Sequence, residues 1–388
     1  MENEHFETQA IASQLERTSN NENSVPLYLT SSFIFDTADD MRAAFADEKE
    51  AYIYSRYSNP NNTEFIHKMC LLEGAEAGVA TASGMAAIFT TFMTLLKSGD
   101  HLISCSSIFS ATHAIFTKHF PKWNISYSYF NAGNPEEIEK LIQPNTRFIY
   151  LETPTNPAIE VIDLAVVSAI AKKHNLLFIV DNCFATPYIQ QPIRFGADIV
   201  IHSATKYIDG QGRVLGGCVL GKKEIIHDIY LFGRITGPSL SSFNAWILSK
   251  SLETLALRME RHSENALYIA QQLEGNAKLE FIKYPFLPSH PHYNIAKKQM
   301  KGGGGIVTFS IKGGNEAATR FMDKLKMILI TSNLGDSRTL ATHPSSSTHC
   351  KLSEEERLAV GITPGLIRLS IGLENKEDIL KDVLQALN

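Results

Sequence analysis

The sequence predicts an α/β protein, with a large domain built on a mostly parallel sheet and a smaller α+β domain at the C-terminus. Short apolar runs alternate with amphipathic segments between residues 79 and 202, which is the pattern of βα units. The chain has 388 residues, more than a single hydrophobic core usually holds. After about residue 250 a long amphipathic stretch precedes further strand-like runs. We therefore expect an N-terminal arm (1–55), a large domain (56–250) and a C-terminal domain (251–388).

The expected arm has no dense apolar period. Its segment 24–35, SVPLYLTSSFIF, is apolar and extended in character, and an arm with exposed apolar side chains usually packs on something, often a second subunit. Beyond the arm, Asn59 to Asn62 predict a turn, and Thr63 is expected to cap a helix that ends at Leu72.

The large domain should contain six strands and at least four helices, joined at βα turns such as Ser83-Gly84. The smaller domain should begin with one or two amphipathic helices in 246–275 and continue as a mixed α+β unit. Expected strands are 79–82, 101–106, 125–130, 147–152, 176–182, 197–202, 304–312 and 366–372, and expected helices are 85–97, 112–120, 135–142, 164–174, 315–326 and 375–387.

Composition excludes several classes of function. The formal net charge of −5 gives no electrostatic attraction to nucleic acid or to an anionic membrane, and no apolar run is long enough to span a bilayer. The polar, acidic N-terminus does not resemble a secretion signal. Five scattered cysteines without a C-x-x-C pair argue against both disulfides and a metal site. We expect a cytoplasmic protein without a bound metal.

Three features should meet at the carboxyl edge of the predicted sheet, where ligands bind in open α/β folds. The strand 176–182 delivers Asp181, the 197–202 strand is followed by Lys206, and Ser83-Gly84 opens a helix. Each feature alone has an ordinary explanation, since most lysines are solvated and strand-end aspartates often cap turns. Their convergence favours a shared site.

This combination suits pyridoxal phosphate (PLP). A lysine amine forms the Schiff base with the aldehyde, and an aspartate keeps the ring nitrogen protonated so that the ring withdraws electrons. A helix N-terminus binds the phosphate, and Ser203 and Thr205 add hydroxyl donors. A Gly-rich stretch with glycines at 210, 212, 216 and 217 is expected to form a flexible loop after Lys206.

Other classes of protein fit less well. Ser203-Ala204-Thr205-Lys206 is an S-x-x-K motif, as in serine acyl-enzymes, but it follows a strand, and the accompanying motifs stand in the wrong order. Gly210, Gly212 and Gly216 have the wrong spacing for a nicotinamide-binding loop. A non-catalytic scaffold would require that the purified protein lack a visible chromophore.

The motifs YSRYSNPNN (54–62), TASGMAA (81–87), ETPTNP (152–157), VDNCFATP (180–187), HSATKYIDGQGRVLGG (202–217) and NLGDSRTLATHP (333–344) resemble the Cys/Met-metabolism family of PLP enzymes over nearly the full length. The resemblance implies an aspartate-aminotransferase-like fold (fold type I) with PLP as cofactor. It also implies a homotetramer built from dimers that share active sites. Segments 236–258 and 284–304 resemble the branch that adds sulfide to O-succinyl-L-homoserine, giving homocysteine and succinate. O-acetylhomoserine sulfhydrylase, cystathionine γ-synthase and γ-lyase remain alternatives.

The resemblance also implies roles for individual residues. Lys206 would hold the aldehyde and act as catalytic base, and Asp181 would bind the ring nitrogen. Arg368 would bind the substrate α-carboxylate as a charge-assisted pair, with Asn333 and Asn156 nearby. Further implied cofactor contacts are Gly84, Met85, Ser203 and Thr205 at the phosphate, Asn156 at the phenolic oxygen, Phe109 on the ring, and Tyr54 and Arg56 at the phosphate of a neighbouring subunit.

Two positions depart from the family pattern. Phe109 stands where many relatives stack a tyrosine, so the ring keeps its stacking surface but loses a hydroxyl. Proton transfer then depends on Lys206 and Tyr54. Ala111 stands where the γ-lyase branch carries a cysteine, which disfavours a degradative reaction.

Overall fold

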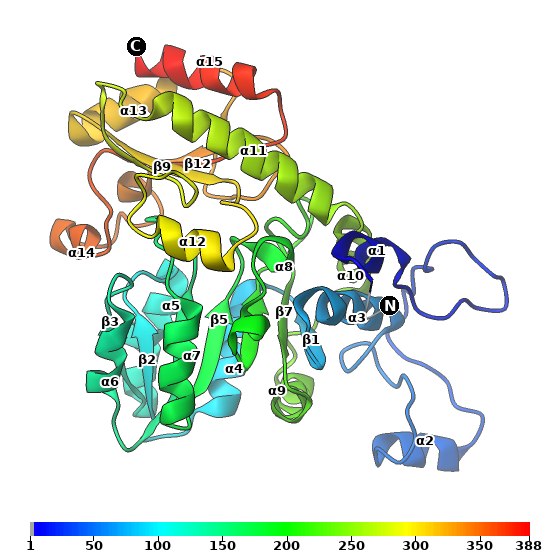
Figure 1. Cartoon of the computed structure of the whole chain (residues 1–388). Coiled ribbons are helices and arrows are strands. Elements are labelled where there is room, and N and C mark those ends of the chain that lie inside the picture. The colour runs from blue at the N-terminus through cyan, green and yellow to red at the C-terminus, as the bar shows by residue number, and fades with distance from the viewer. Residues whose placement is uncertain (1–3) are drawn as a thin grey trace.

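The computed structural model describes residues 4–388 and contains two sheets, one above the other in Figure 1. The larger sheet has the strand order β1-β7-β6-β5-β4-β2-β3, and only β7 runs antiparallel to its neighbours within the described chain. The prediction of a mostly parallel sheet is therefore confirmed. Its strands are β1 (Ala77–Thr81), β2 (His101–Cys105), β3 (Ser126–Phe130), β4 (Thr146–Glu152), β5 (Leu177–Asp181), β6 (Ile199–His202) and β7 (Gly217–Gly221).

Helices cover the larger sheet because each βα connection returns across a face of it. The central strands β4, β5 and β6 are almost wholly buried and rich in branched apolar residues, as a sheet covered on both faces requires. The helices of this part are α3 (Pro60–Glu73), α4 (Gly84–Leu95), α5 (Ser110–Ala114), α6 (Ile138–Leu141), α7 (Leu164–Lys173), α8 (Thr186–Ile189), α9 (Lys223–Thr236) and α10 (Ser242–Leu252).

The smaller sheet has the order β10-β11-β12-β9-β8 and a separate apolar core. Helix α11 (Leu255–Leu273) runs along this sheet in Figure 1 and packs with α15 (Lys376–Leu387). The expected boundary near residue 250 lies inside α10. The remaining elements are β8 (Leu279–Lys283), β9 (Ile306–Ile311), β10 (Leu329–Ile330), β11 (Leu340–Thr342), β12 (Leu366–Ser370), α12 (Tyr293–Gln299), α13 (Gly314–Lys324) and α14 (Glu354–Ala359).

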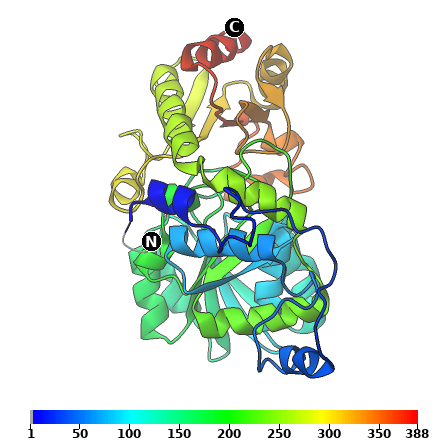
Figure 2. The same cartoon turned by 90° about the vertical axis from the view of Figure 1, so that its right-hand side faces the viewer.

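The N-terminal arm is mostly loop and leaves apolar side chains in solvent. It contains α1 (Phe6–Ala12) and α2 (Ala38–Phe45), and α2 lies far from the smaller sheet in Figures 1 and 2. The Ile34 side chain is 97% exposed and Leu29 is 71% exposed. The arm therefore carries an uncovered apolar surface beside Tyr54.

The end of the Gly-rich stretch differs from the expected flexible loop. Gly217 opens β7, a fully buried strand that pairs with β1 and β6. A Cβ at Gly217 would lie 2.4 Å from the Ser83 carbonyl oxygen. The glycine therefore allows β7 to pass close to the turn between β1 and α4, and the sequence pattern alone did not distinguish that close approach from flexibility.

Three expected elements begin or divide differently. The prediction of Thr63 as helix cap is wrong, because Asn59 caps α3 by accepting a hydrogen bond from Asn61 N at 3.0 Å, and Pro60 suits the first helical position. The expected helix 112–120 is α5 followed by a π-helical turn (Ile115–His119) and a 3₁₀ turn (Phe120–Trp123). The expected helix 135–142 divides into a 3₁₀ turn (Pro135–Glu137) and α6.

Two findings concern the predicted exclusions. Across residues 4–388 no helix is long and apolar enough to cross a membrane, and no cluster of His, Cys, Asp and Glu in that range suits a metal ion. All five cysteines are free thiols in this structure.

Candidate active site

A cavity of about 450 Å³ lies at the carboxyl ends of β4, β5 and β6. The smaller sheet closes it from the other side, with Arg368 on β12 and the segment 332–334 after β10. It brings together ten of the twelve predicted site residues, namely Gly84, Met85, Phe109, Asn156, Asp181, Ser203, Thr205, Lys206, Asn333 and Arg368.

Lys206 lies in a tight turn directly after β6. Its Nζ donates a hydrogen bond to Asn333 Oδ1 at 2.7 Å. Burial lowers the pKa of the Lys206 amine, and the nearby Arg368 guanidinium lowers it further. A lowered pKa favours the neutral amine, which is the form that acts as a nucleophile or a base. Asn333, predicted to contact substrate, thus contacts the lysine in this structure.

Asp181 ends β5 and lies opposite Glu152, which ends β4. Asp181 Oδ1 accepts a hydrogen bond from Cys183 N at 3.0 Å. Burial raises the pKa of Asp181 to about 6. Burial also raises the pKa of Glu152, and the neighbouring Asp181 charge raises it further. Two buried acids this close favour one shared negative charge, unless a cation binds between or beside them.

Glu152 is a cavity residue that the sequence prediction omitted. Its Oε1 accepts a hydrogen bond from Phe109 N at 2.7 Å, so it fixes the start of α5. The signal was available, because Glu152 is the last residue of a predicted strand and opens the ETPTNP motif. Cys183 and Thr348 also line the cavity and were not predicted.

The N-terminus of α4 forms the predicted phosphate position. Ser83 caps the helix by accepting from Ala86 N at 3.1 Å, and Gly84 and Met85 follow in the cavity wall. A Cβ at Gly84 would lie 2.6 Å from Ser203 Cβ, so only glycine leaves the backbone amides accessible there. The Thr205 hydroxyl bonds the Gly216 backbone, accepting from its N–H at 3.1 Å, and so also fixes the turn.

Arg368 is held in place by neutral acceptors. Only 3% of its surface is exposed, and its guanidinium donates to Asn156 Oδ1 at 3.0 Å and to the Ser332 and Asn333 carbonyl oxygens at 3.0 and 3.1 Å. Its buried Nε has no hydrogen-bond partner among the described residues. Burial lowers the pKa of Arg368 to about 10. A buried, partly unpaired guanidinium is suited to an incoming carboxylate.

Tyr54 and Arg56 do not reach the cavity of their own chain. Tyr54 is 42% exposed, and both residues line a separate surface hollow formed with the arm. The Arg56 guanidinium donates to the Arg234 carbonyl oxygen and lies 4.8 Å from the centre of the Tyr57 ring. Whatever these two residues bind, it lies outside the subunit's own cavity.

A family model for Cys/Met metabolism PLP-dependent enzymes matches residues 7–388. The chain belongs to this family. The match confirms the predicted family and, with it, PLP as the cofactor and the status of an enzyme.

Individual relatives cover nearly the whole chain. An O-succinylhomoserine sulfhydrylase from Pseudomonas aeruginosa is 44% identical over 387 residues, 100% of this chain and 96% of the relative. An L-methionine gamma-lyase from Porphyromonas gingivalis is 42% identical, covering 94% of this chain and 92% of the relative.

A solved structure gives the fold. A putative O-acetylhomoserine (thiol)-lyase from Campylobacter jejuni superimposes with a TM-score of 0.94 at 35% identity, covering 98% of this chain and 99% of its own. That structure contains N'-pyridoxyl-lysine-5'-monophosphate. The expected fold type I is thereby confirmed.

The residues of the cavity fit PLP. A partly buried amine and a partly buried carboxyl line the same cavity, and the carboxyl has a raised pKa, as expected of an acid that awaits a cationic partner. Gly84 opens a helix N-terminus beside Ser203. Lys206 would hold the aldehyde, Asp181 the ring nitrogen, and the start of α4 the phosphate.

Proposed function

We propose that the chain catalyses γ-replacement on O-succinyl-L-homoserine, with sulfide as the nucleophile, to give homocysteine and succinate. The observation that carries the proposal is the 44% identity to an O-succinylhomoserine sulfhydrylase over the whole chain. A second relative described by that activity, from Mycobacterium tuberculosis, is 40% identical over 93% of this chain. Ala111 in α5, two residues after Phe109, supports synthesis over degradation, because the γ-lyase pattern has a thiol there.

Arg368 orients the substrate in this proposal. Its guanidinium takes the α-carboxylate, and its unpaired Nε supplies a donor that the folded chain leaves free. Asn156 Oδ1 accepts a hydrogen bond from Arg368 Nη1 and keeps the guanidinium plane fixed. Fixing the carboxylate places the Cα proton within reach of one base, which is the main gain from orientation.

Lys206 then transfers protons. Its lowered pKa raises the fraction of neutral amine, which is the form that accepts a proton. Lys206 removes the proton from Cα and assists removal of one from Cβ. The electron pair released at Cβ expels succinate as the Cγ–O bond breaks. Hydrosulfide then forms the new Cγ–S bond, and protons return to Cβ and Cα. Bound PLP supplies an electron sink conjugated with the substrate nitrogen.

Asp181 and Phe109 provide the surroundings for this step. With PLP bound, Asp181 would accept a hydrogen bond from the protonated ring nitrogen, which would serve as the cationic partner of its carboxylate. Phe109 lines the cavity and has no hydroxyl, so it covers the ring without moving protons. Proton transfer therefore rests on Lys206, together with Tyr54 of a neighbouring subunit if the site is shared.

We propose further that the active protein is a tetramer built from dimers that share active sites. The support is geometric: Tyr54 and Arg56 lie outside their own cavity, beside an arm with exposed apolar side chains. The hollow they line suits a second copy of the chain, whose phosphate site would receive both residues. The cytoplasmic location stays a prediction.

Measured kcat/KM values separate the candidate reactions. The purified enzyme should be assayed with O-succinyl- and O-acetyl-L-homoserine, each with sulfide and with cysteine, and with methionine alone for release of a 2-oxo acid. We expect the succinyl ester with sulfide to give the highest value. A strong preference for the acetyl ester with cysteine, or rapid methionine breakdown, would overturn the proposal in favour of the corresponding alternative.

A further inference from the structure

Lys206 lies in a backbone turn whose last carbonyl groups are bonded from outside the turn. Within the turn, Asp209 N donates to Ala204 O at 2.9 Å, and Gly210 N donates to Lys206 O at 2.8 Å. The carbonyl oxygens of Tyr207 and Ile208 come at the end of the turn, where carbonyls have no partner within the turn itself.

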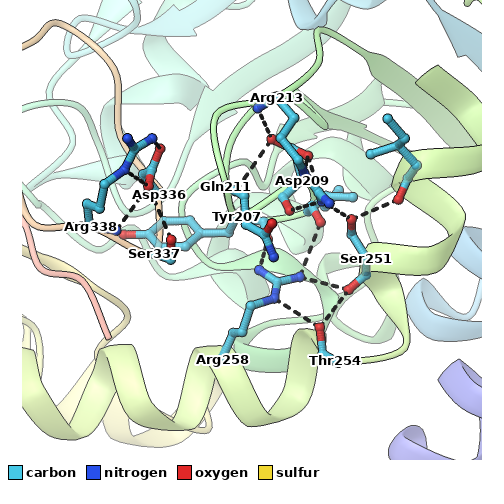
Figure 3. A network of polar contacts seen from close by, with 12 residues as sticks. Tyr207, Asp209, Gln211, Arg213, Ser251, Thr254, Arg258, Asp336, Ser337 and Arg338 are labelled. Atoms are coloured by element: carbon cyan, nitrogen blue, oxygen red, sulfur yellow. Dashed lines mark hydrogen bonds and ion pairs between the residues drawn. The ribbon is translucent and has the colours of Figure 1, made fainter. Parts of the chain in front are cut away.

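Arg258 on α11 supplies that partner. Its Nη1 donates to the Tyr207 carbonyl oxygen and its Nη2 to the Ile208 carbonyl oxygen at 3.2 Å. Nη2 also donates to the Ser251 carbonyl oxygen at 2.8 Å, and Nε to the Thr254 hydroxyl at 3.3 Å. Figure 3 shows Arg258 reaching from its helix across to this turn.

Only 7% of the surface of Arg258 is exposed. Even so, the acceptors bonded to its guanidinium are neutral carbonyl and hydroxyl oxygens. Asp209, the acid on the same turn, is bound instead by Arg213, whose backbone N–H and Nε donate to it at 2.7 and 3.0 Å. Burial lowers the pKa of Arg258 to about 10. A buried cation without a bound carboxylate is unfavourable unless its donors are well satisfied, and the planar fork of arginine suits several carbonyls at once.

The other side of the turn is held by the segment that contacts the lysine amine. Ser337 N donates to Gly210 O at 2.8 Å, and a Cβ at Gly335 would lie 2.5 Å from Tyr207 N. The same segment begins with Asn333, whose side chain accepts from Lys206 Nζ. The lysine turn is thus fixed between α11 and residues 333–337.

We propose that Arg258 is a positioning residue for Lys206. By holding the two carbonyls that follow the lysine, it fixes the backbone from which Nζ reaches into the cavity. This inference rests on the proposed function for the role of Lys206. Arg258 touches neither substrate nor cofactor in this account, and it acts through the turn.

Two pairs of variants test the proposal. Arg258→Met removes the donors, and Arg261→Met is its control, because Arg261 is an exposed arginine of the same helix α11 that pairs with Glu264. Gly210→Ala displaces the guanidinium from the side of the turn, since its Cβ would lie 2.1 Å from Arg258 Nη1 at φ +71°. Gly275→Ala is the matched control, with φ +77° and nothing within 4 Å.

Three readouts are taken on each holoenzyme: kcat and KM, the pH midpoint of the cofactor's visible absorbance, and the dissociation constant of PLP. We expect Arg258→Met and Gly210→Ala to lower kcat about 100-fold, with KM little changed, and to shift the absorbance midpoint. Arg258→Lys should restore part of kcat, while both controls should match the wild type. Circular dichroism melts verify folding, and if Arg258→Met does not fold, Gly210→Ala and Arg258→Lys still decide.

Wild-type kcat, absorbance midpoint and PLP affinity in folded Arg258→Met and Gly210→Ala would overturn the inference. The absorbance titration requires no substrate, so it remains decisive if the sulfhydrylase proposal fails. A wild-type enzyme with a normal titration but no turnover of O-succinylhomoserine with sulfide would contradict the proposed function alone.

Discussion

The two halves of the predicted site differ in how far one chain completes them. Lys206, Asp181 and Arg368 are buried or partly buried around one cavity and held by in-chain contacts. Tyr54 and Arg56 are exposed and lie on a different hollow. The comparison indicates that one chain brings Lys206, Asp181 and Arg368 together without help from a second. In the assembly proposed above, Tyr54 and Arg56 would instead reach the phosphate site of a second chain.

The largest expected effect is at Lys206. Lys206→Ala should lower kcat by at least about 10²–10⁴-fold, because it removes the general base, and should abolish the lysine-dependent visible absorbance. Steady-state kinetics and an absorption spectrum with added PLP check both. Asn333→Ala, which removes only the acceptor of the lysine amine, is the comparison variant. An active Lys206→Ala enzyme would place the chemistry elsewhere.

Arg368→Ala should weaken substrate capture. Removing one partner of a buried charge pair costs about 2–5 kcal/mol, so KM should rise strongly while the absorbance of the cofactor remains. Arg368→Lys should recover only part of the loss, because lysine lacks the planar fork. An unchanged KM in Arg368→Ala would exclude this arginine as the carboxylate site.

Asp181 predicts a pH dependence of stability in the cofactor-free protein. Its folded pKa of about 6 is raised above the ordinary 3.8 by burial, so folding favours the protonated acid. That contribution is fully present below about pH 4 and is lost as the pH rises through about 6, a change of about 3 kcal/mol. Asp181→Asn should therefore stabilise the PLP-free protein at pH 8 but hardly at pH 4, as measured by thermal melts.

In the holoenzyme the same substitution should act in the opposite direction, because it removes the acceptor for the ring nitrogen and weakens PLP binding. If the melting temperatures of the PLP-free wild type and Asp181→Asn respond to pH identically, the raised pKa of Asp181 is contradicted.

A variant of Arg56 tests directly whether Tyr54 and Arg56 serve the site of a second chain. Arg56→Ala should weaken PLP binding by about 1.5–3 kcal/mol, the value of a hydrogen bond to a charged group. Mixing it with Lys206→Ala should regenerate roughly a quarter of the activity of intact sites, because random pairing makes half of the dimers mixed and each holds one complete site. If the two variants are unfolded together and refolded as mixed dimers without regaining activity, the sites are not shared.

The sequence predicted the sheet and the catalytic edge because both depend on local patterns. Apolar runs of five to seven residues mark β4 and β5, and their last residues necessarily meet at one edge. It missed Glu152, although this residue ends β4, since a second acid beside Asp181 gains meaning only from the strand register. It missed the strand character of Gly217 because a close backbone approach is invisible in one dimension. The role of Arg258 depends on contacts about 50 residues apart along the chain, which no local pattern encodes.

The most direct test of the central claim is to reduce the holoenzyme with borohydride and locate the pyridoxyl group by peptide mass spectrometry. The account predicts that the modification lies on Lys206, and that Asp181→Asn lowers the amount of PLP retained. A pyridoxyl group on any other lysine, with Lys206 unmodified, would contradict it.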